Sequence, residues 1–230
     1  MHHSHFDTRG YPILDPAEGY SQWAPTYEDT VPDELDIRLL GRLQSVDWNS
    51  HTNILDIACG TGRIANWLSQ HTNAPVTGID ITPGMLDVAR QRNIYHSLHE
   101  GDAIALPFDD ASFDLSIMSL ADEHIEDLAP VYAEAARVTK PRGSFILVGY
   151  HPHFLMLGIP THFRDGHGNS TSIESYVHQL SDHTTAALNA GWRLQEMREG
   201  IIDDVWIARK PKWEQYRHHP VSFVLTWAKS

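Results

Sequence analysis

The chain has 230 residues, 41% of them hydrophobic, which is enough for a substantial buried core. It carries 17 Lys and Arg against 30 Asp and Glu, a formal net charge of −13, which argues against a protein that neutralises nucleic-acid phosphates or an anionic membrane surface. Its 16 histidines are an excess that composition alone leaves unexplained.

The apolar pattern predicts alternating strands and helices from residue 53 onward. Short β-branched runs between amphipathic segments are typical of a parallel sheet covered by helices on both faces. The expected strands are 53–58, 75–80, 112–120 and 144–150, and the expected helices are 63–71, 82–92 and 127–139.

The last third of the chain departs from this alternation. Residues 151–170 are rich in His, Pro and Gly and are expected to be irregular. Residues 171–190 have apolar side chains at helical spacing and are expected to form one helix that ends at Gly191. Residues 192–202 and 221–229 are predicted strands, and their proximity at the end of the chain favours an antiparallel finish to the sheet.

No second core is evident, so residues 1–230 are expected to form one domain. Within it, residues 1–46 are expected to form an N-terminal helix and lid. Residues 151–190 are expected to form a lid over the substrate, because so long a connection in a compact domain is usually functional. The alternative is a segment that packs on the end of the sheet or on a second subunit.

The single cysteine, Cys59, rules out an intramolecular disulfide. The N-terminus lacks the basic and apolar regions of a secretory signal, and no apolar run approaches the roughly 20 residues that span a bilayer. We therefore expect a soluble, cytoplasmic protein.

The most informative stretch is the run DIACGTGR at 56–63, which follows a predicted strand and opens a predicted helix. Gly60 and Gly62 let the backbone bend tightly and approach a ligand closely. Asp80 ends the next strand, where its carboxylate can accept hydrogen bonds from both hydroxyls of a ribose. The turn lacks the lysine of a phosphate-binding loop. The alternative is a tight strand–helix turn that only happens to be flanked by acids.

This stretch, taken as LDIACGTGR, resembles the first motif of class I S-adenosylmethionine-dependent methyltransferases. GIDITPGMLDVAR (78–90) is similar to their second motif, and EGDAIALPFDDASFDLSIM (100–118) to their third and fourth, in wording common in the small-molecule type 11 branch. The resemblance covers about residues 20–150. It implies a Rossmann-like, seven-stranded, mostly parallel α/β sheet with helices on both faces and an antiparallel last strand. Ala58 replaces the usual glycine, and alanine suits that turn only if its φ is negative.

The resemblance implies S-adenosyl-L-methionine as cofactor and S-adenosyl-L-homocysteine as its product. It places Asp56 and Gly60 near the methionine amino group, Asp80 on the ribose hydroxyls and Asp102 on the adenine amino group. The expected cofactor-binding residues are Tyr20, Tyr27, Asp56, Ala58, Gly60, Gly62, Asp80, Ile81, Met85, Asp102, Ala103 and Leu120.

Tyr20, Trp23 and Tyr27 lie in a stretch that resembles the N-terminal aromatic segment of many of these enzymes. Their rings are expected either to lie against the sulfonium in a cation–π arrangement or to pack on the core, and packing is favoured for Trp23.

Histidines follow two strand ends, where this architecture carries out its chemistry. His124 is a candidate general base for an oxygen nucleophile, and His151 is the second catalytic candidate. The alternatives are a His124 paired with a neighbouring acid and a His151 that caps a loop. The substrate candidates are His153, His162, Tyr176 and His178. His-x-His at 151–153 has metal-ligand side chains, but Pro152 interrupts the strand that would align them, and no metal is predicted.

We therefore expect methyl transfer from S-adenosylmethionine to a small molecule, at oxygen rather than nitrogen, carbon or sulfur, by in-line displacement. Nucleic acid and membrane are not expected as partners, and monomer and homodimer both remain open. The alternatives are a protein that uses the cofactor for non-methyl chemistry and a non-catalytic regulator or partner subunit.

Overall fold

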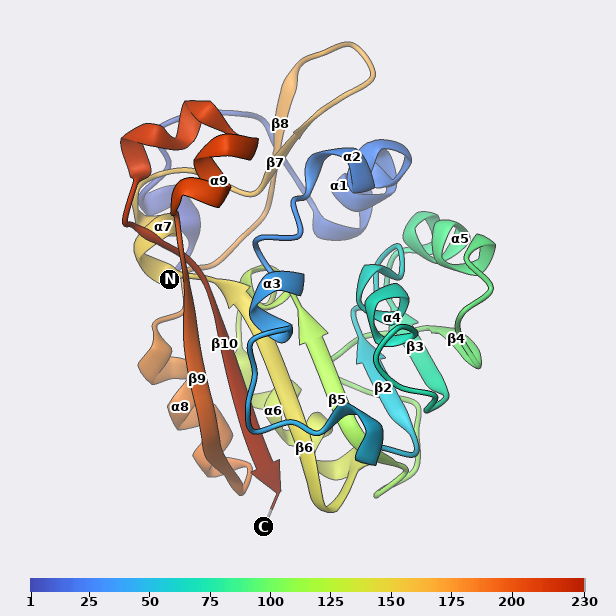
Figure 1. Cartoon of the computed structure of the whole chain (residues 1–230). Helices are drawn as coiled ribbons and strands as arrows, with labels where there is room; N and C mark the ends of the chain where they lie inside the picture. The colour runs from blue at the N-terminus through green and yellow to red at the C-terminus, as the bar shows by residue number, and fades with distance from the viewer. Residues whose placement is uncertain (230) are drawn as a thin grey trace.

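The computed structural model describes residues 1–229 and is built on a seven-stranded sheet (Figure 1). Its strands are β2 (Ile54–Ile57), β3 (Val76–Asp80), β4 (Ser97–Glu100), β5 (Phe113–Ser119), β6 (Thr139–Tyr150), β9 (Trp192–Ile201) and β10 (Pro220–Lys229). Their order in space is β4-β3-β2-β5-β6-β10-β9. The last strand, β10, is antiparallel to both of its neighbours, and the other neighbouring strands are parallel, which confirms the predicted sheet.

Helices cover both faces of this sheet (Figure 1). They are α3 (Ile37–Leu40), α4 (Arg63–Leu68), α5 (Pro83–Gln91), α6 (Leu128–Val138) and α8 (Leu180–Asn189). Ile54 packs in the core that includes α3 and α4, whereas the next residue, Leu55, packs in the core that includes α6 and α8. Successive side chains of a strand point to opposite faces, so a strand covered on both faces is apolar throughout. Within residues 1–229, no helix has the length and apolar character needed to cross a membrane.

Two strands differ from the sequence expectation. Strand β4 is not among the predicted strands because it has no apolar run. It lies at the edge of the sheet, and its side chains remain partly exposed. Strand β6 begins at Thr139 rather than at residue 144, since Thr139 already pairs with Phe113 before a register shift.

A cap of short elements lies over the carboxyl ends of the parallel strands (Figure 1). It contains α1 (Pro16–Trp23), α2 (Tyr27–Thr30), α7 (Pro152–Met156), α9 (Asp204–Arg209) and a small sheet of β1 (Ile13–Leu14), β8 (Ser170–Ile173) and β7 (His162–Arg164). Short 3₁₀ turns complete the chain at His3–His5, Ala24–Thr26, Trp48–Ser50, Asp122–His124 and Pro211–Tyr216. Both predicted lid segments contribute to this cap, and their lid function stays a prediction.

The prediction of one helix over residues 171–190 is wrong. Strand β8 occupies Ser170–Ile173, where it pairs in parallel with β1 and antiparallel with β7. Backbone partners on both sides outweigh the helical spacing of its apolar side chains, and β-branched Thr171 and Ile173 suit a strand. The helix starts only at Leu180, where Gln179 and Asp182 form a capping box. It ends before Gly191 (φ +84°), as expected.

The expectation of an irregular 151–170 segment is also wrong in part, because α7 and β7 lie within it. Pro152 starts α7 rather than disrupting a strand, as proline suits the first turn of a helix.

Candidate functional site

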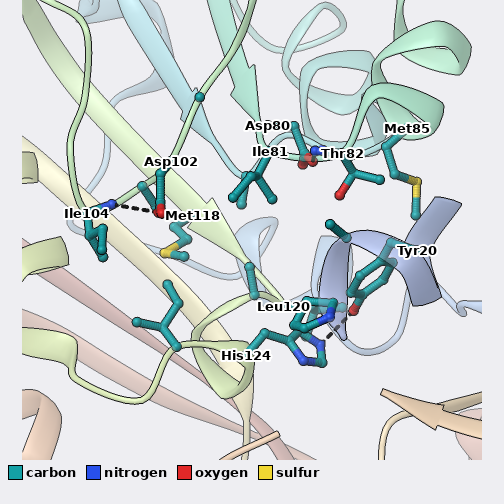
Figure 2. A pocket seen from close by; sticks show the side chains of 18 of the residues that line it. Tyr20, Asp80, Ile81, Thr82, Met85, Asp102, Ile104, Met118, Leu120 and His124 are labelled. Atoms are coloured by element: carbon teal, nitrogen blue, oxygen red, sulfur yellow. Dashed lines mark hydrogen bonds between the residues drawn. The ribbon is translucent and has the colours of Figure 1, made fainter. Parts of the chain in front are cut away.

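A cavity of about 330 Å³ lies at the carboxyl ends of β2, β3 and β5, beneath α1 (Figure 2). Open parallel sheets generally bind their ligands at this edge. The cavity is lined by most of the residues expected to bind the cofactor, namely Tyr20, Tyr27, Ala58, Gly60, Asp80, Ile81, Met85, Asp102, Ala103 and Leu120.

Asp80 joins the end of β3 to the glycine turn. Its Oδ2 accepts a hydrogen bond from the Gly60 N–H at 2.7 Å, and its Oδ1 accepts one from the Thr82 N–H at 2.8 Å. Burial raises the pKa of Asp80, and these two bonds oppose that rise. The carboxylate therefore holds the turn in place and also forms part of the cavity wall.

The turn between β2 and α4 uses three residues with positive φ: Ala58 (+53°), Gly60 (+53°) and Gly62 (+85°). The condition that alanine at position 58 needs a negative φ is thus not met. The chain must reverse within a few residues to bring the Gly60 N–H to Asp80, and this places Ala58 in the left-handed region at a cost of about 1 kcal/mol. At Gly60, no other heavy atom lies within 4 Å of the position that a Cβ would take, so the backbone there is open to a ligand.

Two of the expected cofactor residues lie behind the turn instead of in the cavity. Asp56 accepts a hydrogen bond from the Tyr95 hydroxyl at 2.7 Å, and burial raises the pKa of this carboxyl group to about 7. Gly62 faces the same tyrosine, because a Cβ on it would lie 3.0 Å from Tyr95 Cε2. The structure thus gives both residues packing partners on the far side of the turn, and their role toward a cofactor stays a prediction.

The loop after β4 forms another wall of the cavity. Asp102 Oδ1 accepts a hydrogen bond from the Ile104 N–H at 3.1 Å, which holds the loop in a tight turn (Figure 2). Ile81 is half exposed at 49%, a large apolar side chain on an open cavity wall. Such a wall suits the face of a flat ring.

His124 and Tyr20 meet at the cavity, coming from the turn after β5 and from α1 (Figure 2). His124 Nδ1 lies 2.6 Å from the carbonyl oxygen of Glu174, which can only accept, so Nδ1 carries the proton. Nε2 then accepts from the Tyr20 hydroxyl at 2.8 Å. Burial lowers the pKa of His124 to about 4, so the imidazole is neutral near pH 7.

Glu123 lies directly behind this pair. Burial, and then the neighbouring Asp122, raise the pKa of Glu123 to about 8, so its carboxyl group is protonated near pH 7. Its Oε1 lies 3.4 Å from His124 Nε2. This contact therefore joins two neutral groups near pH 7. The pairing of His124 with a neighbouring acid, an alternative from the sequence, is present in this uncharged form.

The second catalytic candidate, His151, does not line this cavity. Its Nδ1 accepts from the His153 N–H at 3.1 Å and its Nε2 donates to Glu199 Oε1 at 2.9 Å, so it caps the start of α7. This is the geometry of the loop-capping alternative. The structure does not bring His151 together with His124 at the cavity, and its catalytic role stays a prediction.

The predicted substrate residues are dispersed. His153 Nε2 lies 3.1 Å from His219 Nδ1, His178 donates to the Ile125 carbonyl oxygen at 2.7 Å, and Tyr176 packs edge-on against His2. Only His162 lines a cavity, a second and larger one described below. Across the described residues, no group of three or more His, Cys, Asp or Glu is arranged to hold a metal ion.

Sequence reasoning missed several residues of the cavity wall: Asp15, Pro16, Ala17, Thr82, Ile104, Met118, Ser119 and Glu126. Met118 and Ser119 belong to the carboxyl end of β5, a place that the sheet topology alone could have marked. The residues of α1 reach the cavity through folding of the N-terminal segment, and no local pattern signals that contact.

Both the sequence and the fold of the chain are similar to those of known methyltransferases. Residues 55–147 match a family model described as a methyltransferase domain. A malonyl-(acyl-carrier protein) O-methyltransferase from Serratia marcescens is 36% identical over 129 residues, 55% of this chain and 49% of that protein. A demethylmenaquinone methyltransferase from Chlorobaculum parvum is 36% identical over 105 residues, 46% of this chain and 44% of that protein. The chain therefore spans about half the length of these curated relatives.

A solved structure of an S-adenosylmethionine-dependent methyltransferase from Mesorhizobium loti shares the fold. It superposes with a TM-score of 0.64 at 20% identity and covers 93% of this chain and 100% of its own. The likeness thus extends beyond residues 55–147 to the cap and the antiparallel end of the sheet.

Proposed function

We propose that the chain is a class I S-adenosylmethionine-dependent methyltransferase of the type 11 branch, which binds S-adenosyl-L-methionine in the smaller cavity and transfers its methyl group to a small-molecule acceptor. The match of residues 55–147 to a methyltransferase-domain family model supports this proposal. One observation carries the proposal: the Asp80 carboxylate is bonded to the glycine turn at the cavity wall. The acidic net charge of −13 argues against a nucleic-acid substrate.

The residues present fit this cofactor. In the described part of the chain, the cavity wall contains acids, among them Asp15, Asp80, Asp102 and Glu126, and no lysine or arginine. That charge suits a ligand that carries a sulfonium and an ammonium group, and it would repel one that binds through phosphates. The open backbone at Gly60 and a volume of about 330 Å³ are compatible with a small-molecule ligand.

When bound, the cofactor supplies an electrophilic methyl group on a positively charged sulfur. We assign Asp80 to the ribose hydroxyls, Asp102 to the adenine amino group and Ile81 to the adenine face. The N-terminal helix α1 covers the site through Tyr20 and thereby excludes water from the reacting atoms. The chain's main contribution is to align the acceptor with the methyl group.

We propose oxygen as the acceptor atom, in keeping with the name of the Serratia relative. In this proposal the Tyr20 hydroxyl takes the proton of an acceptor hydroxyl while its own proton passes to His124 Nε2, to which it is already hydrogen-bonded. With a pKa near 4, His124 is a weak base, so this pair suits an acidic acceptor group better than an aliphatic alcohol.

Calorimetric titration with S-adenosyl-L-homocysteine, followed by methyl-transfer assays with labelled S-adenosyl-L-methionine over a panel of oxygen, nitrogen, carbon and sulfur acceptors, tests the proposal. We expect one binding site per chain and a loss of at least tenfold in affinity in Asp80→Asn, because the amide accepts fewer ribose hydrogen bonds. Asp87→Asn is the matched control, since Asp87 lies exposed on α5 and is 69% accessible. Absence of binding would refute the proposal, and binding without any turnover would replace methyl transfer by a regulatory or non-methyl role.

A further inference from the structure

A second, larger cavity of about 860 Å³ lies within the cap. Its walls come from residues 9–35, from residues 150–170, which include the end of β6, α7 and β7, and from residues 210–216 near the end of the chain. These three segments are far apart in sequence and converge over the carboxyl ends of the strands (Figure 1). None of them belongs to the matched methyltransferase segment at 55–147.

The charge of this cavity is opposite to that of the whole chain. Arg9, Arg164, Lys210 and Lys212 line it, against one lining carboxylate, Asp29. Among residues 1–229, none of these four cations takes part in an ion pair. The nearby Glu34 is paired with Arg209 at 3.4 Å, outside the cavity wall. In a chain with a net charge of −13, four cations gathered without carboxylate partners give this cavity a local positive charge that favours an anionic ligand.

The positive charge of these cations affects the pKa of His162, a neighbour on the same wall. Burial lowers the pKa of His162, and Arg9, Lys212 and Lys210 lower it further by charge repulsion. Burial also lowers the pKa of Lys210, with repulsion from Lys212 as a further cause. An anion in this cavity would offset the charge repulsion at both groups.

The rest of the wall is aromatic. Trp213 stacks on the buried Trp206 with ring centroids 4.9 Å apart, and Lys210 Nζ lies 5.3 Å from the centroid of the Trp213 ring. Tyr216 and Phe163 also line the cavity. Trp213 also stacks on Phe154, with ring centroids 5.2 Å apart. Rigid aromatic side chains next to a cation provide an apolar surface and a charge partner for a flat anionic molecule.

The two cavities share a wall of stacked rings. Tyr20, which lines the smaller cavity, stacks on Trp23, which lines the larger one, with centroids 5.7 Å apart and planes inclined by 14°. Trp23 in turn stacks on Phe163 at 5.5 Å and 13°. Trp23 and Phe163 are buried, so these rings separate the two cavities.

We propose that the larger cavity is a second ligand site, separate from the smaller cavity, and that it selects a small molecule with a flat apolar body and an anionic group, a carboxylate, sulfonate or phosphate, held by the cations of its wall. The anionic end lies against Arg164 and Lys212, and the apolar body lies along the aromatic part of the wall.

Fluorescence titration with anilinonaphthalene sulfonate, and with its uncharged analogue phenylnaphthylamine, tests this assignment in the intact chain. We expect one sulfonate probe per chain, binding that weakens as salt is raised, and binding of the uncharged analogue that is weaker by roughly tenfold. The double substitution Arg164→Gln with Lys212→Gln should weaken the sulfonate probe by roughly tenfold and leave the analogue unchanged. Both side chains are exposed and lack ion pairs in the described chain, so folding should be retained, and circular dichroism checks it.

Arg193→Gln is the matched control, because Arg193 is an exposed cation on β9, outside both cavities. Displacement of the probe by benzoate and by phenyl phosphate shows which anionic group the site prefers. Equal binding of both probes, or an equal loss in Arg193→Gln, would overturn the proposal, as would failure of both anions to displace the probe. Calorimetry with S-adenosyl-L-homocysteine runs in parallel and reports on the smaller cavity, so that failure of the anion site is distinguished from failure of the proposed function.

Discussion

The hydroxyl of Tyr20 lies 2.8 Å from Nε2 of His124, although the two residues are separated by 104 positions in the chain. The bond links the N-terminal helix to the turn after β5, at the wall of the smaller cavity. Because the Glu174 carbonyl oxygen fixes the proton on Nδ1, the direction of this bond is fixed as well.

Removal of the Tyr20 hydroxyl should therefore reduce turnover more than cofactor binding. In Tyr20→Phe, we expect kcat to fall by roughly tenfold to a hundredfold, because the proton path to Nε2 is lost, while the affinity for S-adenosyl-L-homocysteine changes little. Steady-state kinetics and calorimetry measure the two effects. Tyr176→Phe is the control, since Tyr176 lies outside both cavities. An equal loss in both variants would remove the special role of Tyr20 and support Tyr176 as a substrate residue.

Glu123 should make the protein less stable as the pH rises. Its pKa is raised from 4.5 to about 8, so the folded state holds a proton that the unfolded state releases. Its contribution to stability is fully present below pH 4.5 and is lost as the pH rises to 8. We expect Glu123→Gln, which cannot ionise, to exceed the parent in unfolding free energy at pH 8 by roughly 2 kcal/mol or more. Urea unfolding at pH 5 and pH 8 tests this, and a gain of the same size at both values would contradict it.

His124 should act in the opposite direction. Its pKa is lowered from 6.5 to about 4, so between these pH values the unfolded state binds a proton that the folded state does not bind. Its contribution is fully present above pH 6.5 and is lost as the pH falls to 4. We expect His124→Gln to flatten the fall of unfolding free energy over this window. His71→Gln, at an exposed histidine in the turn after α4 that stacks on Trp67, is the control.

Ala58→Gly should stabilise the fold. The residue has a φ of +53°, where a glycine carries no steric penalty and an alanine does. We expect a gain of about 1 kcal/mol in unfolding free energy, measured by urea denaturation. Ala65→Gly, inside α4, is the matched control and should lose about 1 kcal/mol. A loss in both variants would show that the left-handed residue is not strained.

Gly62→Ala should destabilise the turn for two reasons. The φ of +85° is unfavourable for alanine, and the new Cβ would lie 3.0 Å from Tyr95 Cε2 and 3.1 Å from Arg92 Cδ. We expect a loss of roughly 2 kcal/mol. Gly166→Ala has open space and no positive φ, so thermal unfolding of that control should be almost unchanged. Equal melting temperatures for the two variants would contradict the prediction.

The sequence alone was enough to predict most of the central sheet and the position of the glycine turn. The inner parallel strands β2, β3 and β5 are covered on both faces, so their residues are mostly apolar, and each buried run is visible without knowledge of its neighbours. The turn is similarly local, because Gly60 and Gly62 supply the positive φ values that it needs. Local patterns failed where backbone pairing decided the structure, as at Ser170–Ile173, whose partners lie in two other segments.

The tertiary structure decided which of the many histidines line the smaller cavity. His124 and His151 both follow strand ends, yet only His124 reaches the smaller cavity, because Pro152 starts a helix that His151 caps. Burial by distant segments also decided the charge states, since desolvation is what lowers the pKa of His124 and raises that of Glu123. The cationic cavity arises in the same way. Its cations come from segments far apart in the chain, so no single stretch of the sequence predicts that they gather in one place.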